Sequence, residues 1–483
     1  MAMATLWLCI AFPVAFAQKG YPVTIQGTAS FATNCEIQLT VFDDMLTYHK
    51  TVVAKDIIDK KGKFYLTYNA IQPQLVQISI RTSRAEFYVE PGRTYDFTID
   101  MDPQLFEQLD PMAYGGFLQI SNNDSTLKED INLKINHFEN TLDRVVDFYS
   151  PNIIGDMTPS QYDSIVYQIG KRFPIQYHPT NFYKSYIYYS LGAIEQIILQ
   201  KYPDSLYHKY LDNEYILYEN PAYMNFFTSF YHSYLLKSKK INPQELRKSI
   251  NEEGSLIQLI NVVGKDELLV NEKIRELVII LNLMQLYDND NFNKENILSL
   301  LKNIELNSHF AEHRHIAADA LADLTRFENG APFSISQMKE ASGAQFNPEK
   351  FKGKYVFLQF FNTTCTDCIR EMMILQDLSQ KYKGQIEFVS VSLDFHFSKF
   401  LQFKEKYRQF DWHFVHFNNC YDWLDEMGIT TLPDNMLLNP DGTLYQRYAP
   451  DITRKLPLFL ARLFNAKDDK GKPLDVHENN RNE

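Results

Sequence analysis

The stretch 360-FFNTTCTDCIREMM-373 carries two of the five cysteines in a chain of 483 residues. It overlaps Tyr355–Phe361, an almost continuous apolar run that predicts a central strand covered on both faces. Residues 369–382 predict a helix. Cys365 and Cys368 therefore lie where a buried strand ends and a helix begins. In that position they form a redox pair, half of a metal site or a structural disulfide.

The start of a helix favours a reactive thiolate. Free backbone N–H groups and the helix dipole stabilise an anion there, so the pKa of Cys365 is expected to be lowered. Cys368, one turn later, can reach back to it. We therefore predict that Cys365 attacks a partner disulfide. Cys368 then resolves the mixed disulfide, which leaves Cys365–Cys368 oxidised.

The other two interpretations are weaker. A structural zinc site needs four ligands, and the chain has no second C-x-x-C. His413 and His416 lie three apart in a predicted strand, so they point to opposite faces. His309 and His313 are four apart in a predicted helix, and we expect a solvated face there. A static disulfide stays an alternative, although an exposed turn gains little from it. No metal and no cofactor are expected.

The rest of the chain predicts a multidomain protein. Alternating apolar and polar residues in 18–102 predict a small antiparallel β-sandwich. Residues 103–325 have helical spacing and predict a helical domain. Residues 326–466 return to strands and helices of an α/β domain. Within it we expect strands at 387–393, 412–417 and 435–438, a tight turn at 439-NPDG-442 and a closing helix at 453–464.

The ends of the chain suggest export. Residues 1–17 contain an apolar run that ends in Ala-Phe-Ala, which predicts a signal peptide cut before Gln18, although no basic residue precedes the run. The tail 467–483 is charged and predicted to be disordered. The net charge of −12 argues against nucleic-acid binding, which needs a basic face.

The order strand, C-x-x-C, helix, strand, Leu432-Pro433 and 436-MLLNPDG-442 resembles the thioredoxin fold. It is most similar to exported thiol–disulfide oxidoreductases of the TlpA/ResA type. With a β domain and a helical region before it, the chain resembles envelope proteins of Bacteroidetes bacteria. The resemblance implies that Cys365 attacks and that Cys368 resolves. It also implies that Pro433 is a cis-proline facing the pair, which leaves the Leu432 backbone free to bind a substrate strand.

Two further features come from the resemblance. Glu371, three residues after the second cysteine, matches a glutamate that TlpA-like proteins often carry. Residues 395–410 resemble an insertion that separates this group from minimal thioredoxins.

The chain also departs from the W-C-x-P-C pattern of the family. Thr364 replaces the tryptophan, Asp367 replaces the proline, and Met373 replaces a helix proline. Gln359 stands where minimal thioredoxins have a buried acid, and it cannot act as a base. The charge of Asp367 opposes a thiolate, so it favours a reducing couple.

The sequence therefore predicts an exported thiol–disulfide oxidoreductase of the periplasm or cell envelope, which reduces or isomerises disulfides of envelope proteins. A membrane or periplasmic electron donor and a homodimer are left open. The alternative is an envelope interaction module that uses a thioredoxin-like scaffold with little turnover. Cys35 and Cys420 are expected to be buried or free thiols, with Cys420 as a weak candidate for a third redox partner.

Overall fold

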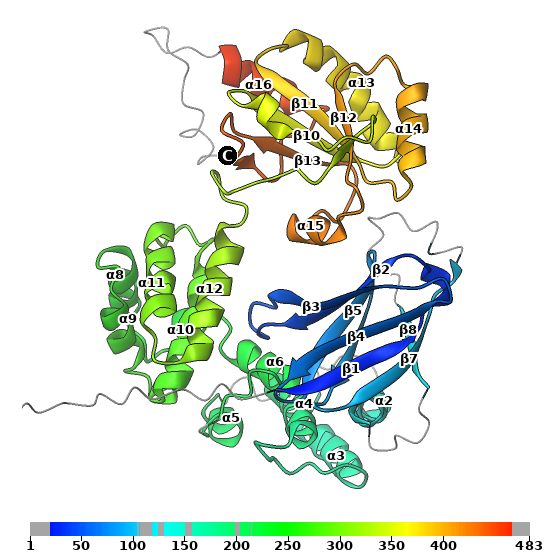
Figure 1. Ribbon diagram of the computed structural model, residues 1–483. Coiled ribbons are helices and arrows are strands. Elements are labelled where there is room, and N and C mark those ends of the chain that lie inside the picture. Colours follow the sequence, from blue (N-terminus) through cyan, green and yellow to red (C-terminus); the bar gives the residue numbers. More distant parts are fainter. Residues whose placement is uncertain are drawn as a thin grey trace, which may run out of the picture.

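The computed structural model describes residues 20–103, 106, 118–123, 130–149, 157–198, 203–213 and 215–465. A β-sandwich, a helical region and an α/β domain follow one another along the chain (Figure 1). The predicted signal peptide and the predicted disordered tail lie outside the described residues. Within the described ranges, no helix has the length and apolar character needed to cross a membrane.

Two four-stranded sheets form the N-terminal sandwich, in the orders β4-β1-β7-β8 and β3-β2-β5-β6. The strands are β1 (Tyr21–Thr28), β2 (Glu36–Phe42), β3 (Lys50–Ile57), β4 (Lys63–Ala70), β5 (Gln74–Ile80), β6 (Ser83–Val89), β7 (Thr94–Asp100) and β8 (Gln119–Asn122). Alternate residues such as Ile25, Ile37 and Ile78 point inward and are fully buried, as the period of two predicts.

Two details differ from the sequence-based expectation for the sandwich. β1 and β7 pair in parallel, so the sandwich is not wholly antiparallel. β8 pairs with β7 although it lies beyond residue 102, where the β region was expected to end. Both pairings join segments that are distant in sequence, and period-two alternation carries no information about which strands become neighbours.

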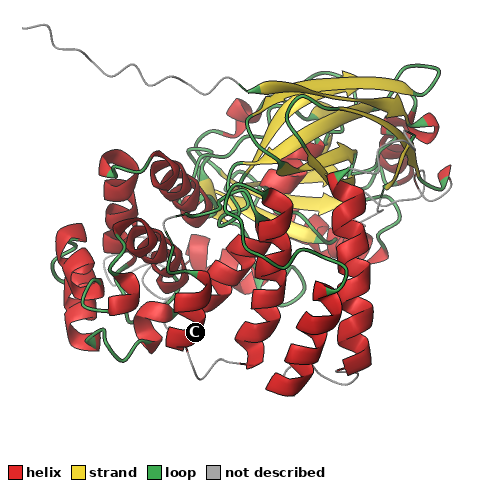
Figure 2. Cartoon of the chain, turned by 90° about the horizontal axis from the view of Figure 1, so that it is seen from below, coloured by secondary structure: helices red, strands yellow, loops and turns green. Residues whose placement is uncertain are grey.

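Helices make up the middle region, which packs as a group beside the strands (Figure 2). They are α2 (Ile131–Tyr149), α3 (Pro159–Gly170), α4 (Phe182–Ile198), α5 (Pro203–Tyr210), α6 (Pro221–Phe230), α7 (Tyr234–Lys237), α8 (Pro243–Asn251), α9 (Leu256–Val263), α10 (Glu272–Leu286), α11 (Lys294–Asn307) and α12 (Ala311–Thr325). Asparagine side chains accept backbone N–H groups at several helix starts, such as Asn271 before α10. The tyrosine-rich α4 buries Tyr186 and Tyr189, so these two side chains are part of the helical core.

One expectation about this region is wrong. His309 precedes α12, and His313 is 0% exposed instead of lying on a solvated face. Its ring nitrogens lie 2.7 Å from a Glu276 carboxylate oxygen and 2.8 Å from the Tyr218 hydroxyl. A polar residue in an amphipathic helix is buried when partners on other helices satisfy its hydrogen bonds, and those partners are invisible in the local pattern.

The C-terminal domain contains a six-stranded sheet in the order β14-β13-β10-β11-β12-β9. Its strands are β9 (Lys339–Glu340), β10 (Tyr355–Phe361), β11 (Ile386–Ser392), β12 (His413–His416), β13 (Asp434–Leu438) and β14 (Leu444–Gln446), and its helices are α13 (Thr366–Lys381), α14 (Phe397–Lys406), α15 (Tyr421–Glu426) and α16 (Leu456–Asn465). β10, β11 and β12 are parallel neighbours. Parallel neighbours need crossover connections, and α13 and α14 supply them. The 395–410 segment therefore contains the crossover helix α14.

Both faces of this sheet are covered, as the apolar run in β10 predicts. Phe357 and Phe361 face a core that includes side chains of α13, α14 and α16. Leu358 and Phe360 face the opposite core, formed with α15 and residues 331–351. Burial on both faces fixes β10 in the sheet, so the position of the residues that follow it is well defined.

Candidate active site

The redox pair lies at the end of β10 and the start of α13, as predicted. Cys365 is the N-cap residue, and the Cys368 N–H donates to its sulfur at 3.1 Å. The two sulfurs are joined in a disulfide, with 5.3 Å between the Cα atoms. Cys368 is 0% exposed, whereas Cys365 is partly exposed. An incoming sulfur atom therefore meets Cys365, and Cys368 is held behind it.

A polar chain runs beneath Cys368. The Gln359 amide donates to the Cys368 carbonyl oxygen and to a Glu371 carboxylate oxygen, both at 3.2 Å. The Gln359 oxygen accepts from the Ser390 hydroxyl, and that hydroxyl accepts from the Trp412 ring N–H at 2.9 Å. Gln359 thus uses both ends of its amide to hold the α13 backbone and Glu371 against the sheet.

Glu371 is the ionisable group of this chain. It is 8% exposed, and burial raises its pKa above the ordinary value, partly opposed by hydrogen bonds from Gln359 and Asn435. The nearby charges of Asp451 and Asp367 raise its pKa further. A carboxyl group with a raised pKa can exchange a proton closer to neutral pH.

Leu432 and Pro433 lie at the same edge of the sheet as the redox pair. Phe360 is opposite Asp434 in the β10–β13 ladder, so Pro433 precedes β13 where β10 ends. The Leu432–Pro433 peptide bond is cis, as the resemblance implied. The Leu432 side chain packs against the core on both faces of the sheet.

Asp367 lies between the two cysteines and carries its charge outward. Its carboxylate forms an ion pair with Arg370 at 2.8 Å, and both side chains are more than half exposed. Solvent and the guanidinium both screen the carboxylate. The electrostatic effect of Asp367 on the thiolate is therefore smaller than the sequence alone suggests.

A further buried acid near the redox pair was missed by sequence reasoning. Asp394, just after β11, accepts the Thr363 N–H and the Thr363 hydroxyl. The signal that could have found it is its place at the carboxyl end of a strand parallel to β10, where such strands gather functional side chains.

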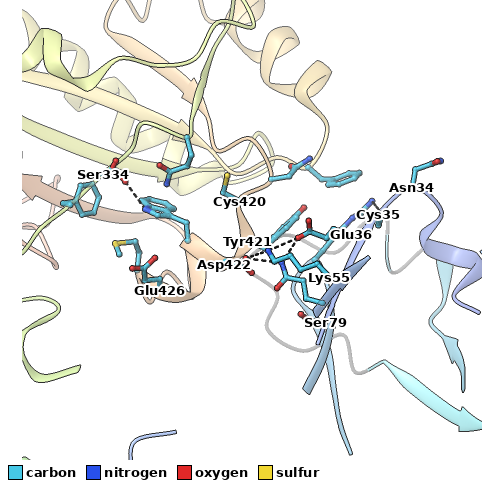
Figure 3. Close-up of a pocket in the computed structure, with 18 of the residues that line it drawn as sticks. Asn34, Cys35, Glu36, Lys55, Ser79, Ser334, Cys420, Tyr421, Asp422 and Glu426 are labelled. Carbon is cyan, nitrogen blue, oxygen red and sulfur yellow. Dashed lines mark hydrogen bonds and ion pairs between the residues drawn. The ribbon is translucent and has the colours of Figure 1, made fainter. Parts of the chain in front are cut away.

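A cleft of about 820 Å³ separates the sandwich from the α/β domain (Figure 3). Cys35 lies on its sandwich side and Cys420 on the other, and both are free thiols. Lys55 crosses the cleft to Asp422, with 2.9 Å between the charged atoms. Cys420 is also the N-cap residue of a helix, α15, but burial and the charge of Asp422 raise its pKa, which makes it a poor nucleophile.

One group of side chains among the described residues has the composition of a metal site. Ligand atoms of Asp43, His49 and Asp319 lie within 4.8 Å of one another. His49 already bonds Asp43 at 2.7 Å. This group joins the sandwich to α12 and lies in a different part of the chain from the redox pair.

Comparison with known proteins places the C-terminal part in a family. Residues 353–444 match the family described as Thioredoxin-like. The C-terminal part of this chain is a thioredoxin-like domain. The domain is similar to the thiol–disulfide oxidoreductase ResA of Bacillus thuringiensis, with 28% identity over 118 residues. It is also similar to ResA of Halalkalibacterium halodurans, with 26% identity over 121 residues. The resemblance to the TlpA/ResA type is thereby confirmed.

These relatives are matched only in part. The alignment with the Bacillus protein covers 24% of this chain and 66% of that protein, just under two thirds of its length. The alignment with the Halalkalibacterium protein covers 25% and 67%. Among solved structures, a thiol:disulfide interchange protein from Bacteroides sp. is 20% identical, with a TM-score of 0.27. The match covers 30% of this chain and 95% of that protein's chain. A thiol–disulfide oxidoreductase from Bacteroides fragilis is 22% identical, with a TM-score of 0.24. The match covers 28% of this chain and 100% of that protein's chain.

Proposed function

We propose that this chain is an exported thiol–disulfide oxidoreductase that reduces or isomerises protein disulfides of the cell envelope. The observation that carries the proposal is the asymmetry of the redox pair within a thioredoxin-like domain. Cys365 is partly exposed at a helix start, and Cys368 is fully buried one turn behind it. The first position suits attack on a partner, and the second suits resolution.

The reaction begins from the reduced pair. The Cys365 thiolate attacks one sulfur of a partner disulfide, and the other partner sulfur leaves with the electron pair of the broken bond. The partner is then joined to Cys365 through a mixed disulfide. The N-cap position stabilises the thiolate before the attack, because the Cys368 N–H points at the sulfur.

Resolution uses Cys368 and Glu371. Cys368 loses its proton and attacks the Cys365 sulfur, and the remaining partner sulfur leaves as a thiolate. Two electrons have then passed to the partner, and the Cys365–Cys368 disulfide is formed. We assign Glu371 as the group that accepts the proton of Cys368, because it is held beside the Cys368 backbone through Gln359.

Leu432 and Pro433 are proposed to bind the substrate. They lie at the sheet edge that carries the redox pair, and the Leu432 backbone is proposed to pair with an extended substrate segment. We further propose that the protein lies in the periplasm or cell envelope and forms a homodimer. A membrane or periplasmic electron donor is proposed to reduce the pair again. Export is supported by the predicted signal peptide at residues 1–17.

Redox equilibration tests this function. The chain from residue 18 to 483 is equilibrated in dithiol/disulfide buffers, and its free thiols are counted by alkylation, with Cys365→Ser as the control. We expect a reversible two-electron couple near the thioredoxin range, about −270 mV, that is absent in the control. A value near −120 mV would mark an oxidant, and a pair that never titrates would leave the interaction module as the function.

A further inference from the structure

The loop between β10 and the redox pair is fastened to the neighbouring strand by one buried carboxylate. Asp394 is 5% exposed and follows β11. It accepts the Thr363 N–H at 3.1 Å and the Thr363 hydroxyl at 2.6 Å. It also accepts the Ser392 hydroxyl at 2.8 Å. Hydrogen bonds to an ionised acceptor are about twice as strong as neutral ones, so this carboxylate is a firm anchor.

The backbone of Asp394 is fixed in turn by β12. His416 is 2% exposed, and its Nε2 lies 2.6 Å from the Asp394 carbonyl oxygen. The Asn418 N–H donates to Nδ1 at 3.0 Å, so Nδ1 carries no proton and Nε2 must donate. Burial lowers the pKa of His416, which keeps this neutral tautomer. The carboxyl ends of three parallel strands are thereby tied together at Asp394.

Thr363 links Asp394 to the reactive cysteine, Cys365. It is two residues before Cys365, so their Cα atoms are at most about 7 Å apart. The chain turns at Asn362, the residue before Thr363. The Asn362 carbonyl accepts the Cys365 N–H at 3.2 Å, and its side chain accepts the Thr364 N–H at 3.1 Å. A shift of Thr363 would move Cys365 away from the start of α13.

We propose that Asp394 is a positioning residue for the redox pair, which acts through Thr363 to hold Cys365 at the N-cap of α13. The inference rests on the proposed function, because it concerns the reactivity of Cys365. Without the hydrogen bonds from Thr363 to Asp394, the loop before α13 samples positions in which the Cys365 sulfur loses the hydrogen bond from the Cys368 N–H. The thiolate is then less stabilised, and the pKa of Cys365 rises.

Three single substitutions in the full chain test the proposal. Thr363→Val removes the hydroxyl donor at nearly constant shape, and Thr363→Ser restores it. Ser392→Ala removes a hydroxyl that donates to the same carboxylate but belongs to β11 instead of the redox loop. The rate at which iodoacetamide alkylates Cys365 in the reduced protein is measured against pH, together with the thermal unfolding midpoint.

We expect Thr363→Val to slow alkylation at pH 7 about fivefold and to move its pH midpoint upward, with Thr363→Ser close to the wild-type protein. Ser392→Ala should lower the unfolding midpoint and leave the pH midpoint unchanged. Equal pH midpoints in all four proteins, or equal shifts for Thr363→Val and Ser392→Ala, would overturn the proposal. A wild-type protein whose Cys365 shows no titration would instead overturn the proposed function, which keeps the two failures apart.

Discussion

Glu371 and Glu276 each form a hydrogen bond with a side chain from another element, and they differ in what lies beside them. Glu371 bonds Gln359 beside a disulfide, at a sheet edge that a partner can approach. Glu276 bonds His313, whose other nitrogen bonds Tyr218, inside a bundle of helices. Both clusters contain groups that could move a proton. Only the first lies beside a sulfur that can react, so a titratable cluster gains chemical meaning from what it faces.

We therefore expect turnover to depend on the cluster around Glu371 and the redox pair, and stability to depend on the cluster around Glu276 and His313. The largest expected effect comes from Cys368→Ala. Without the resolving thiol, Cys365 stays joined to its partner, and turnover with a disulfide substrate should fall by about three orders of magnitude. The mixed disulfide should accumulate and be visible on a non-reducing gel. Cys420→Ala is the matched control, and a similar loss there would contradict the assignment of roles.

His313→Ala should have the largest effect on stability. It leaves the Glu276 carboxylate and the Tyr218 hydroxyl without their shared partner and opens a cavity, at a cost of about 3 kcal/mol. Chemical unfolding measures the loss, and the activity of the remaining folded protein should be unchanged. His208→Ala, at a side chain 65% exposed, is the control and should cost little. A loss of turnover in folded His313→Ala would show that the Glu276–His313 cluster takes part in the chemistry, against this prediction.

Glu371→Gln tests whether the carboxyl group beside the redox pair moves a proton during turnover. Because the pKa of Glu371 is raised, its carboxyl group is still protonated at pH values where an ordinary glutamate has lost its proton. Turnover should therefore rise with pH through that raised pKa. Glu371→Gln should remove this rise and slow turnover about 100-fold. The pH profile of kcat/KM tests it, and a profile identical to that of the wild-type protein would exclude Glu371 as the proton acceptor.

A third glutamate, Glu219, tests how burial and nearby carboxylates make the stability depend on pH. Burial raises the pKa of Glu219 to about 7, with further increases from Asp44 and Asp43. The unfolded chain loses this proton near pH 4.5 and the folded chain near pH 7, so stability is lost as the pH rises between those values. Glu219→Gln should stabilise the protein by about 1 kcal/mol at pH 8, after allowance for solvent screening, and by much less at pH 5. Unfolding midpoints at both pH values measure the difference.

The control for this prediction is Glu252→Gln, at an exposed position. It should leave the pH dependence of unfolding unchanged. If Glu219→Gln stabilises the protein equally at pH 5 and pH 8, the carboxylate is already ionised in the folded protein at pH 5.

Features that depend on neighbours along the chain could be predicted from the amino-acid sequence. The apolar run of β10, the start of α13 at the C-x-x-C and the turn before β14 all follow from local spacing, turn residues and helix-end chemistry. These features were sufficient to predict a thioredoxin-like domain and the positions of Cys365 and Cys368. The cis peptide bond before Pro433 was predicted only from the resemblance to the TlpA/ResA type.

Contacts between residues far apart in the sequence follow from the three-dimensional packing and could not be predicted from local patterns. This packing set Asp394 against Thr363, buried His313 beside Glu276, placed Glu371 on Gln359 and paired β1 in parallel with β7. A buried polar residue and a solvated one look alike in a local pattern, because burial is tolerated only where a partner from elsewhere in the chain completes its hydrogen bonds. Those partners are chosen by the packing of whole helices and strands.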